Sequence, residues 1–98
     1  MKVTKAEARI LRWALGAMED IAYNEDYRVE DEWYDPEHLP ILKGRTLDLS
    51  NASDDAIEDL LYRIEEQMPE MTEGEVGAKR AGPTIAMCDR LAEKIRSA

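Results

Sequence analysis

The sequence predicts a mainly α-helical protein, a small three-helix bundle with a long irregular connector, in a single domain over residues 1–98. Apolar residues recur at the spacing of one helix face in three segments. The connector, residues 25–52, lacks that spacing and contains Pro36 and Pro40, which a regular helix does not accommodate. The expected helices span about residues 5–23, 54–68 and 83–97.

The first helix has the clearest start. Thr4 is followed three residues later by Glu7, which is the capping-box pattern. Trp13 lies beside the apolar stripe, so we expect its ring at the edge of the core. Asn24 is the expected end, because asparagine tolerates the left-handed conformation. The stripe consists of Ile10, Leu11, Ala14, Leu15, Met18, Ile21 and Ala22.

The connector has two interpretations. In one, alternating apolar residues form a short two-stranded ribbon, with Tyr27, Val29 and Trp33 in one strand and Leu47 and Leu49 in the other. In the other, the connector only covers one end of the helical core, and Gly44 turns the chain. The covering residues would be Tyr27, Trp33, Leu39, Ile41 and Leu42. A connector of this length is unusual in a compact domain, and such loops often carry function.

The second helix has a natural N-cap in Ser53 and ends before Pro69. Its first turns are acidic, which the helix dipole favours. Its apolar stripe consists of Ala56, Ile57, Leu60, Leu61, Ile64 and Met68.

The third helix begins with Pro83, which suits the first helical position, after Gly82. A further short helix is expected from Glu73, broken before Pro83. The core face of the third helix is Ile85, Cys88, Leu91, Ala92 and Ile95, with Met87 at its edge. Across the three helices, Ile10, Ala14, Leu60, Leu61, Ile64, Cys88 and Leu91 are expected to be buried together.

Composition limits the class of protein. An apolar share of 44% in 98 residues is above that of disordered chains, and a domain of this size is only modestly stable alone. No apolar run is long enough for a spanning helix or a signal peptide. The single cysteine agrees with a reducing compartment. We therefore expect a cytoplasmic protein without membrane contact.

Charge alternates in blocks along the chain, which has a net charge of −9. Residues 19–37 carry −8 and residues 48–75 carry −9, whereas the three remaining blocks are basic. In one interpretation the basic blocks fold against the acidic ones, and the remaining charge keeps the protein soluble. In the other, an acidic block is a docking surface for a basic partner. Direct nucleic-acid binding is not expected, because phosphate contacts require a basic footprint and this chain lacks one.

No catalytic or metal-binding constellation is found. His38, the only histidine, has no nucleophile at an interpretable spacing, and Cys88 lies on an expected buried face. There is no glycine-rich phosphate loop and no calcium-loop pattern. The sequence therefore predicts no catalytic residue, no cofactor and no metal.

One enzyme class needs a separate test, the all-helical magnesium-dependent nucleotide hydrolases, which use paired carboxylates on facing helices. Glu70 and Glu73 have the E-x-x-E spacing, and Glu32 and Asp35 have the E-x-x-D spacing. Their order is reversed and both pairs adjoin prolines, so this activity is the least favoured alternative.

The leading hypothesis is a small acidic non-enzymatic interaction protein, of the kind that phages and mobile elements encode. It would bind and block a basic site on a host protein, for example by mimicking nucleic acid. A structural or assembly factor acting as a homodimer is the alternative. Aromatic and acidic residues meet in one block, where we expect the partner-binding hot spot. Its residues are Glu30, Asp31, Glu32, Trp33, Tyr34 and Asp35.

Overall fold

The computed structural model describes residues 1–24, 26, 35–68 and 85–98, and within them the predicted mainly helical fold is confirmed. The helices and strands of the described residues are α1 (Lys5–Tyr23), the 3-10 turn η3 (Pro36–His38), β1 (Ile41–Lys43), β2 (Thr46–Asp48), α2 (Asp54–Tyr62), its π-helical continuation η4 (Arg63–Gln67) and α4 (Ile85–Ser97).

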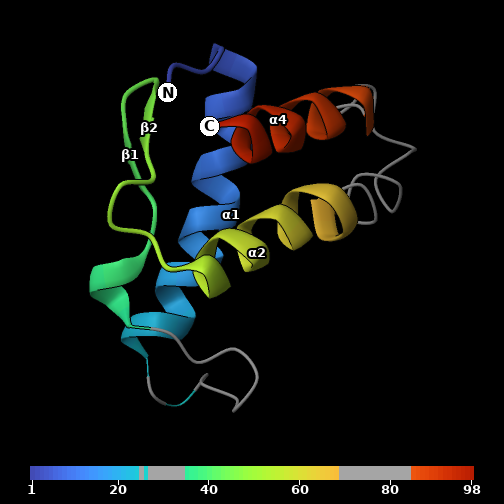
Figure 1. Cartoon of the computed structure of the whole chain (residues 1–98). Coiled ribbons are helices and arrows are strands. Elements are labelled where there is room, and N and C mark those ends of the chain that lie inside the picture. Colours follow the sequence, from blue (N-terminus) through green and yellow to red (C-terminus); the bar gives the residue numbers. More distant parts are fainter. Residues whose placement is uncertain (25, 27–34, 69–84) are drawn as a thin grey trace.

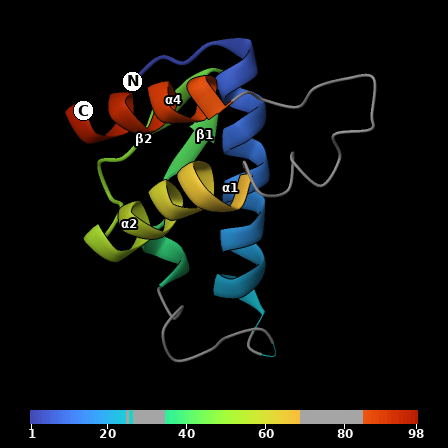
Figure 2. The same ribbon diagram turned by 90° about the vertical axis from the view of Figure 1, so that its right-hand side faces the viewer.

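The helices surround one core. In both views α2 and α4 lie side by side and cross the same face of α1, while the β1–β2 hairpin runs along α1 (Figures 1 and 2). In the part of the chain that the structure describes, no helix is long and apolar enough to cross a membrane.

The start of α1 is as predicted. The Thr4 hydroxyl accepts a hydrogen bond from the Glu7 backbone N–H at 3.1 Å, and the Glu7 carboxylate accepts one from the Thr4 N–H at 2.8 Å. Trp13 is half-buried at the edge of the core. Asn24 does end the helix, but in an extended conformation (φ −115°) rather than the expected left-handed one.

A two-stranded ribbon does form, but with a different first strand from the predicted one. The partner of the Leu47 strand is β1, in the antiparallel register Leu42 opposite Leu47. The predicted strand of Tyr27, Val29 and Trp33 lies outside the described residues. Gly44 turns the chain with φ +60°, a conformation that only glycine adopts without strain.

The N-terminal residues extend this hairpin. The Leu47 N–H donates to the Met1 carbonyl at 2.8 Å, and the Val3 N–H donates to the Arg45 carbonyl at 2.9 Å. These bonds hold Val3 and Leu47 in the core. Leu39 covers the core as expected, whereas Ile41 is 44% exposed, because it lies on the outer face of the hairpin.

The second predicted helix, residues 54–68, is continuous but not regular. Ser53 caps α2 through a hydrogen bond from the Ala56 N–H at 3.1 Å, as expected. The wide turn η4 follows, and its first two residues, Arg63 and Ile64, are both buried. Leu61 was predicted to be a core residue and is only half-buried, because the buried face is centred on Ala56, Leu60 and Ile64.

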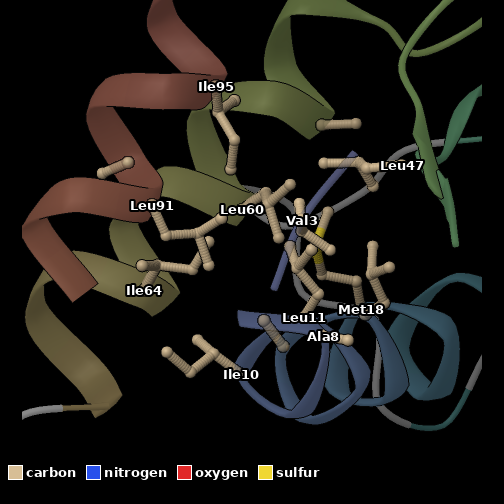
Figure 3. Close-up of a cluster of buried hydrophobic side chains, with 14 of the residues drawn as sticks. Val3, Ala8, Ile10, Leu11, Met18, Leu47, Leu60, Ile64, Leu91 and Ile95 are labelled. Carbon is tan, nitrogen blue, oxygen red and sulfur yellow. The ribbon is translucent and has the colours of Figure 1, made fainter. Parts of the chain in front are cut away.

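The third helix is described from Ile85 onward, and the expected break at Pro83 lies outside the described residues. Its predicted core face is confirmed except for Ile85, which is 54% exposed because the buried stripe begins one turn later, at Cys88. Figure 3 shows Leu91 and Ile95 of α4 meeting Leu60 and Ile64 above the α1 side chains.

Candidate functional site

The predicted hot spot falls mostly outside the described residues, which include only Asp35 of its six members. Asp35 is exposed and caps η3, since its Oδ1 accepts a hydrogen bond from the Glu37 N–H at 2.9 Å, and Pro36 follows at the first helical position. The carboxylate is thus engaged locally. The remaining five residues of the hot spot stay a prediction.

The second acidic block lies on the outward face of α2 and η4, and we call it the acidic surface. Its members share the helix face opposite the buried stripe of Ala56, Leu60 and Ile64. They are Asp54, Asp55, Glu58, Tyr62, Glu65 and Glu66, and all are exposed except Glu65, which is half-buried.

Few cations neutralise the acidic surface. Arg96 of α4 pairs with Glu65 at its edge. The carboxylates of Asp54, Asp55, Glu58 and Glu66 have no hydrogen-bonded or ion-paired partner among the described residues. The dipole of α2 accounts for Asp54 and Asp55, which lie in its first turn, but not for the carboxylates farther along.

An exposed ring lies among these carboxylates. Tyr62 is 50% exposed and lines a shallow hollow of about 480 Å³, together with the half-buried Leu61. Glu58, Glu65, Glu66 and Arg96 complete the lining. A ring beside an apolar side chain within a carboxylate rim is the composition of a protein-binding hot spot, in which aromatic anchors carry the affinity.

Arg63 does not contribute its charge to this surface. Its side chain is buried, and its Nε donates to Asp59 Oδ2 at 2.9 Å while its Nη1 donates to Gln67 Oε1 at 3.0 Å. The π turn at Arg63 places the guanidinium on the inner side of the helix. Turns of this kind are often found at functional sites. Here the consequence is electrostatic, because the cation is withdrawn and the outer carboxylates stay unneutralised.

A second ion pair fixes the two ends of the chain to each other. Lys94 Nζ lies 2.7 Å from Glu7 Oε1, whose side chain is 6% exposed. Burial alone would raise the pKa of Glu7, but hydrogen bonds from Lys94 and Thr4 outweigh burial and lower it. The ion pair of Arg96 with Glu65 joins a basic block to an acidic one, whereas that of Lys94 with Glu7 joins two basic blocks.

Neither candidate nucleophile or base is placed for chemistry. His38 is exposed in η3. Cys88 is fully buried, and burial, followed by the charge of Asp89, raises the pKa of its thiol, which disfavours the reactive thiolate. Within residues 1–24, 26, 35–68 and 85–98, no group of three His, Cys, Asp or Glu side chains could hold a metal ion. Of the two carboxylate motifs, only Asp35 is described.

The sequence analysis missed two features of this face, the burial of Arg63 and the exposure of Tyr62. Tyr62 is the last residue of α2 and lies opposite the buried stripe, and Arg63 lies seven residues after the buried Ala56, on the same side of the helix. The helical period therefore indicates both features, but the sequence analysis did not apply it to these two polar residues. Comparison of the chain with protein-family models, curated proteins and solved structures finds no match.

Proposed function

We propose that the protein is a small non-enzymatic, cytoplasmic interaction protein that binds a basic site on a partner protein through negative charge. The observation that supports this proposal is the acidic surface, where Glu58 and Glu66, two carboxylates without a described partner, line the same hollow as the exposed ring of Tyr62. Charge at the rim of such an interface accelerates association and selects the partner, and the aromatic anchor supplies affinity.

The arrangement suits a partner site that normally binds nucleic acid. Asp54 and Glu58 lie one turn apart on one helix face, and Glu66 continues the unpaired carboxylates along η4, so that negative charges follow the axis of α2 and η4. A protein groove that takes phosphates presents cations at comparable intervals. Competition with nucleic acid for that groove is therefore the specific form of the proposal.

Either the acidic surface or the hot spot predicted from the sequence can supply this interaction, and charge-reversal variants distinguish the two. Glu58→Lys with Glu66→Lys reverses the acidic surface, and Asp31→Lys with Glu32→Lys reverses the hot spot predicted from the sequence. Glu19→Lys with Asp20→Lys is the matched control, because it changes the net charge equally at exposed positions of α1 that face away from α2.

The experiment is capture of partners from a cell lysate by each immobilised protein at about 50 and 500 mM salt, with identification by mass spectrometry and a binding titration of the purified partner. We expect the acidic-surface variant to lose the partner and the control to keep it, with the largest difference at low salt, where screening is weakest. Tyr62→Ala should weaken binding at both salt concentrations. Equal capture by the wild type and both acidic-block variants would contradict the proposal.

A further inference from the structure

Six cationic side chains gather on the outer side of α1 and on the adjoining hairpin, and we call them the basic surface. All six are exposed. The members from α1 are spaced by four and three residues, so they form one stripe on the side opposite the buried face of that helix. The basic surface consists of Lys2, Lys5, Arg9, Arg12, Lys43 and Arg45.

The tertiary structure joins the hairpin cations to the helical ones. Arg45 Nε donates to the Val3 carbonyl at 3.0 Å, and Lys2 is bridged to Thr46 of β2. Arg12 of α1 and Gly44 of the hairpin turn line one hollow of about 340 Å³, and Lys43 and Arg45 flank Gly44. Figure 1 shows the hairpin running alongside the N-terminal half of α1. Segments some 30 residues apart in the chain therefore form one surface.

Carboxylates do not neutralise the basic surface. Within the described residues, none of its six members makes an ion pair. Glu7, the acid of the first block, is buried and bound to Lys94. Asp48 is held by hydrogen bonds from Ser50, which lower its pKa, and Lys43 is close enough to lower it further. Glu19 is the nearest exposed carboxylate on α1: it lines the same hollow as Arg12 and Gly44 without an ion pair to Arg12, and it bounds the basic surface there.

We infer that the basic surface binds the phosphate backbone of duplex DNA. This departs from the expectation drawn from the sequence, because the fold gathers cations of two separate basic blocks on one surface. A cluster of unpaired cations gains most from a ligand with dense, regular negative charge, because each phosphate contact releases condensed counterions. Duplex DNA carries one negative charge per about 1.7 Å of its axis, counting both strands, so it presents a denser array of phosphates than a single strand does.

Repulsion between the acidic surface and DNA bound at the basic surface is weak at physiological salt. The acidic surface lies on the side of α2 opposite its buried stripe, and the helical part of the basic surface lies on the side of α1 opposite its buried face. Two packed helices, each about 10 Å across, separate the surfaces by about 20 Å. The Debye length is about 8 Å at 0.15 M salt, so repulsion from the acidic surface is largely screened. This inference concerns a different face and a different partner from the proposed function, and either can fail alone.

The test is a fluorescence-anisotropy titration in which the protein is added to a labelled duplex of about 20 base pairs and mixed sequence. The titration is repeated at several salt concentrations between about 50 and 200 mM, an interval over which the affinity of phosphate contacts changes strongly. With four or five phosphates neutralised, log K should fall against log salt with a slope of about −4. Arg12→Gln should reduce the magnitude of that slope by about 1, as the loss of one phosphate contact does.

Arg9→Glu with Arg12→Glu should abolish binding, whereas Arg90→Gln should leave both affinity and slope unchanged, since Arg90 is an exposed cation on α4 away from the basic surface. Circular dichroism of each variant checks that the helices persist. If the double charge reversal unfolds the chain, Arg9→Gln replaces it as the test variant, and it should weaken binding. Absence of salt-dependent binding at about 0.1 mM protein, the weak limit of non-specific DNA affinity, would overturn the inference. Equal losses in Arg90→Gln, or tighter binding of the single strand than of the duplex, would overturn it as well.

Discussion

Replacement of Glu7 by glutamine tests the contact on which α1, the N-terminal segment and α4 converge. The Glu7 carboxylate accepts hydrogen bonds from the Thr4 N–H at 2.8 Å and from Lys94 Nζ at 2.7 Å, and its side chain is 6% exposed. Glutamine retains an oxygen for the Thr4 N–H and has nearly the same shape. The substitution therefore removes the charge and leaves the packing in place.

The magnitude follows from the surroundings of the two partners. A hydrogen bond to a charged group contributes about 1.5–3 kcal/mol when it is well shielded. The Lys94 side chain is 39% exposed, so solvent screens the pair and favours the lower end of that range. We expect Glu7→Gln to lower the free energy of unfolding by about 1–2 kcal/mol, which is about 4–12 °C in Tm for a domain of this size.

The pH dependence gives a second measurement. Because the pKa of Glu7 is lowered in the folded state, its contribution is complete above the ordinary glutamate pKa and is lost as the pH falls through the folded-state pKa. Urea denaturation should show the full difference between wild type and Glu7→Gln at pH 7. The difference should shrink in acid, where the wild-type carboxyl is also neutral.

A double-mutant cycle assigns the effect to the ion pair. Glu7→Gln and Lys94→Met should have a coupling energy of about 0.5–1.5 kcal/mol at pH 7, and Glu93→Gln, at an exposed position of α4, should change stability by less than about 0.5 kcal/mol. A coupling energy near zero, or a pH-independent difference between wild type and Glu7→Gln, would refute the role assigned to Glu7.

Two further predictions concern packing and backbone. Leu60→Ala should lower the free energy of unfolding by about 2–4 kcal/mol, because Leu60 is fully buried. Leu61→Ala should lower it by less than about half as much, because Leu61 is half-buried. Equal losses of stability in chemical denaturation would contradict the observed register of α2. Gly16→Ala should raise the free energy of unfolding by about 0.5–1 kcal/mol, since a Cβ there meets no atom within 4 Å in the helix. Gly44→Ala should instead lower it by about 1 kcal/mol, because φ is +60°, and thermal melts that rank these two variants in the opposite order would refute the argument.

The sequence by itself determined the helices, because the signals for them are local. The capping box of Thr4 and Glu7 and the N-cap of Ser53 involve residues three apart, and the apolar period is visible within one segment. These signals predicted the bounds of α1 and the buried faces of α1 and α4 almost residue by residue. They also predicted the turn at Gly44, where only glycine is unstrained.

The tertiary structure decided which segments meet. The strand opposite Leu47 is set by pairing with Ile41–Lys43 and with the N-terminus, and short apolar runs elsewhere in the connector had the same alternating pattern. The π turn of η4 lies against α4, and no local spacing indicated it. Leu61 is only half-buried because the fold turns the side of Ala56, Leu60 and Ile64 toward the core, a choice that a broad apolar stripe leaves open. The tertiary structure also decided where the charges lie in space. The sequence shows a chain of net charge −9, but only the fold places its unpaired cations on one side of the core and the carboxylates of α2 on the other, because ion pairs and helix faces bring together residues that are distant in sequence.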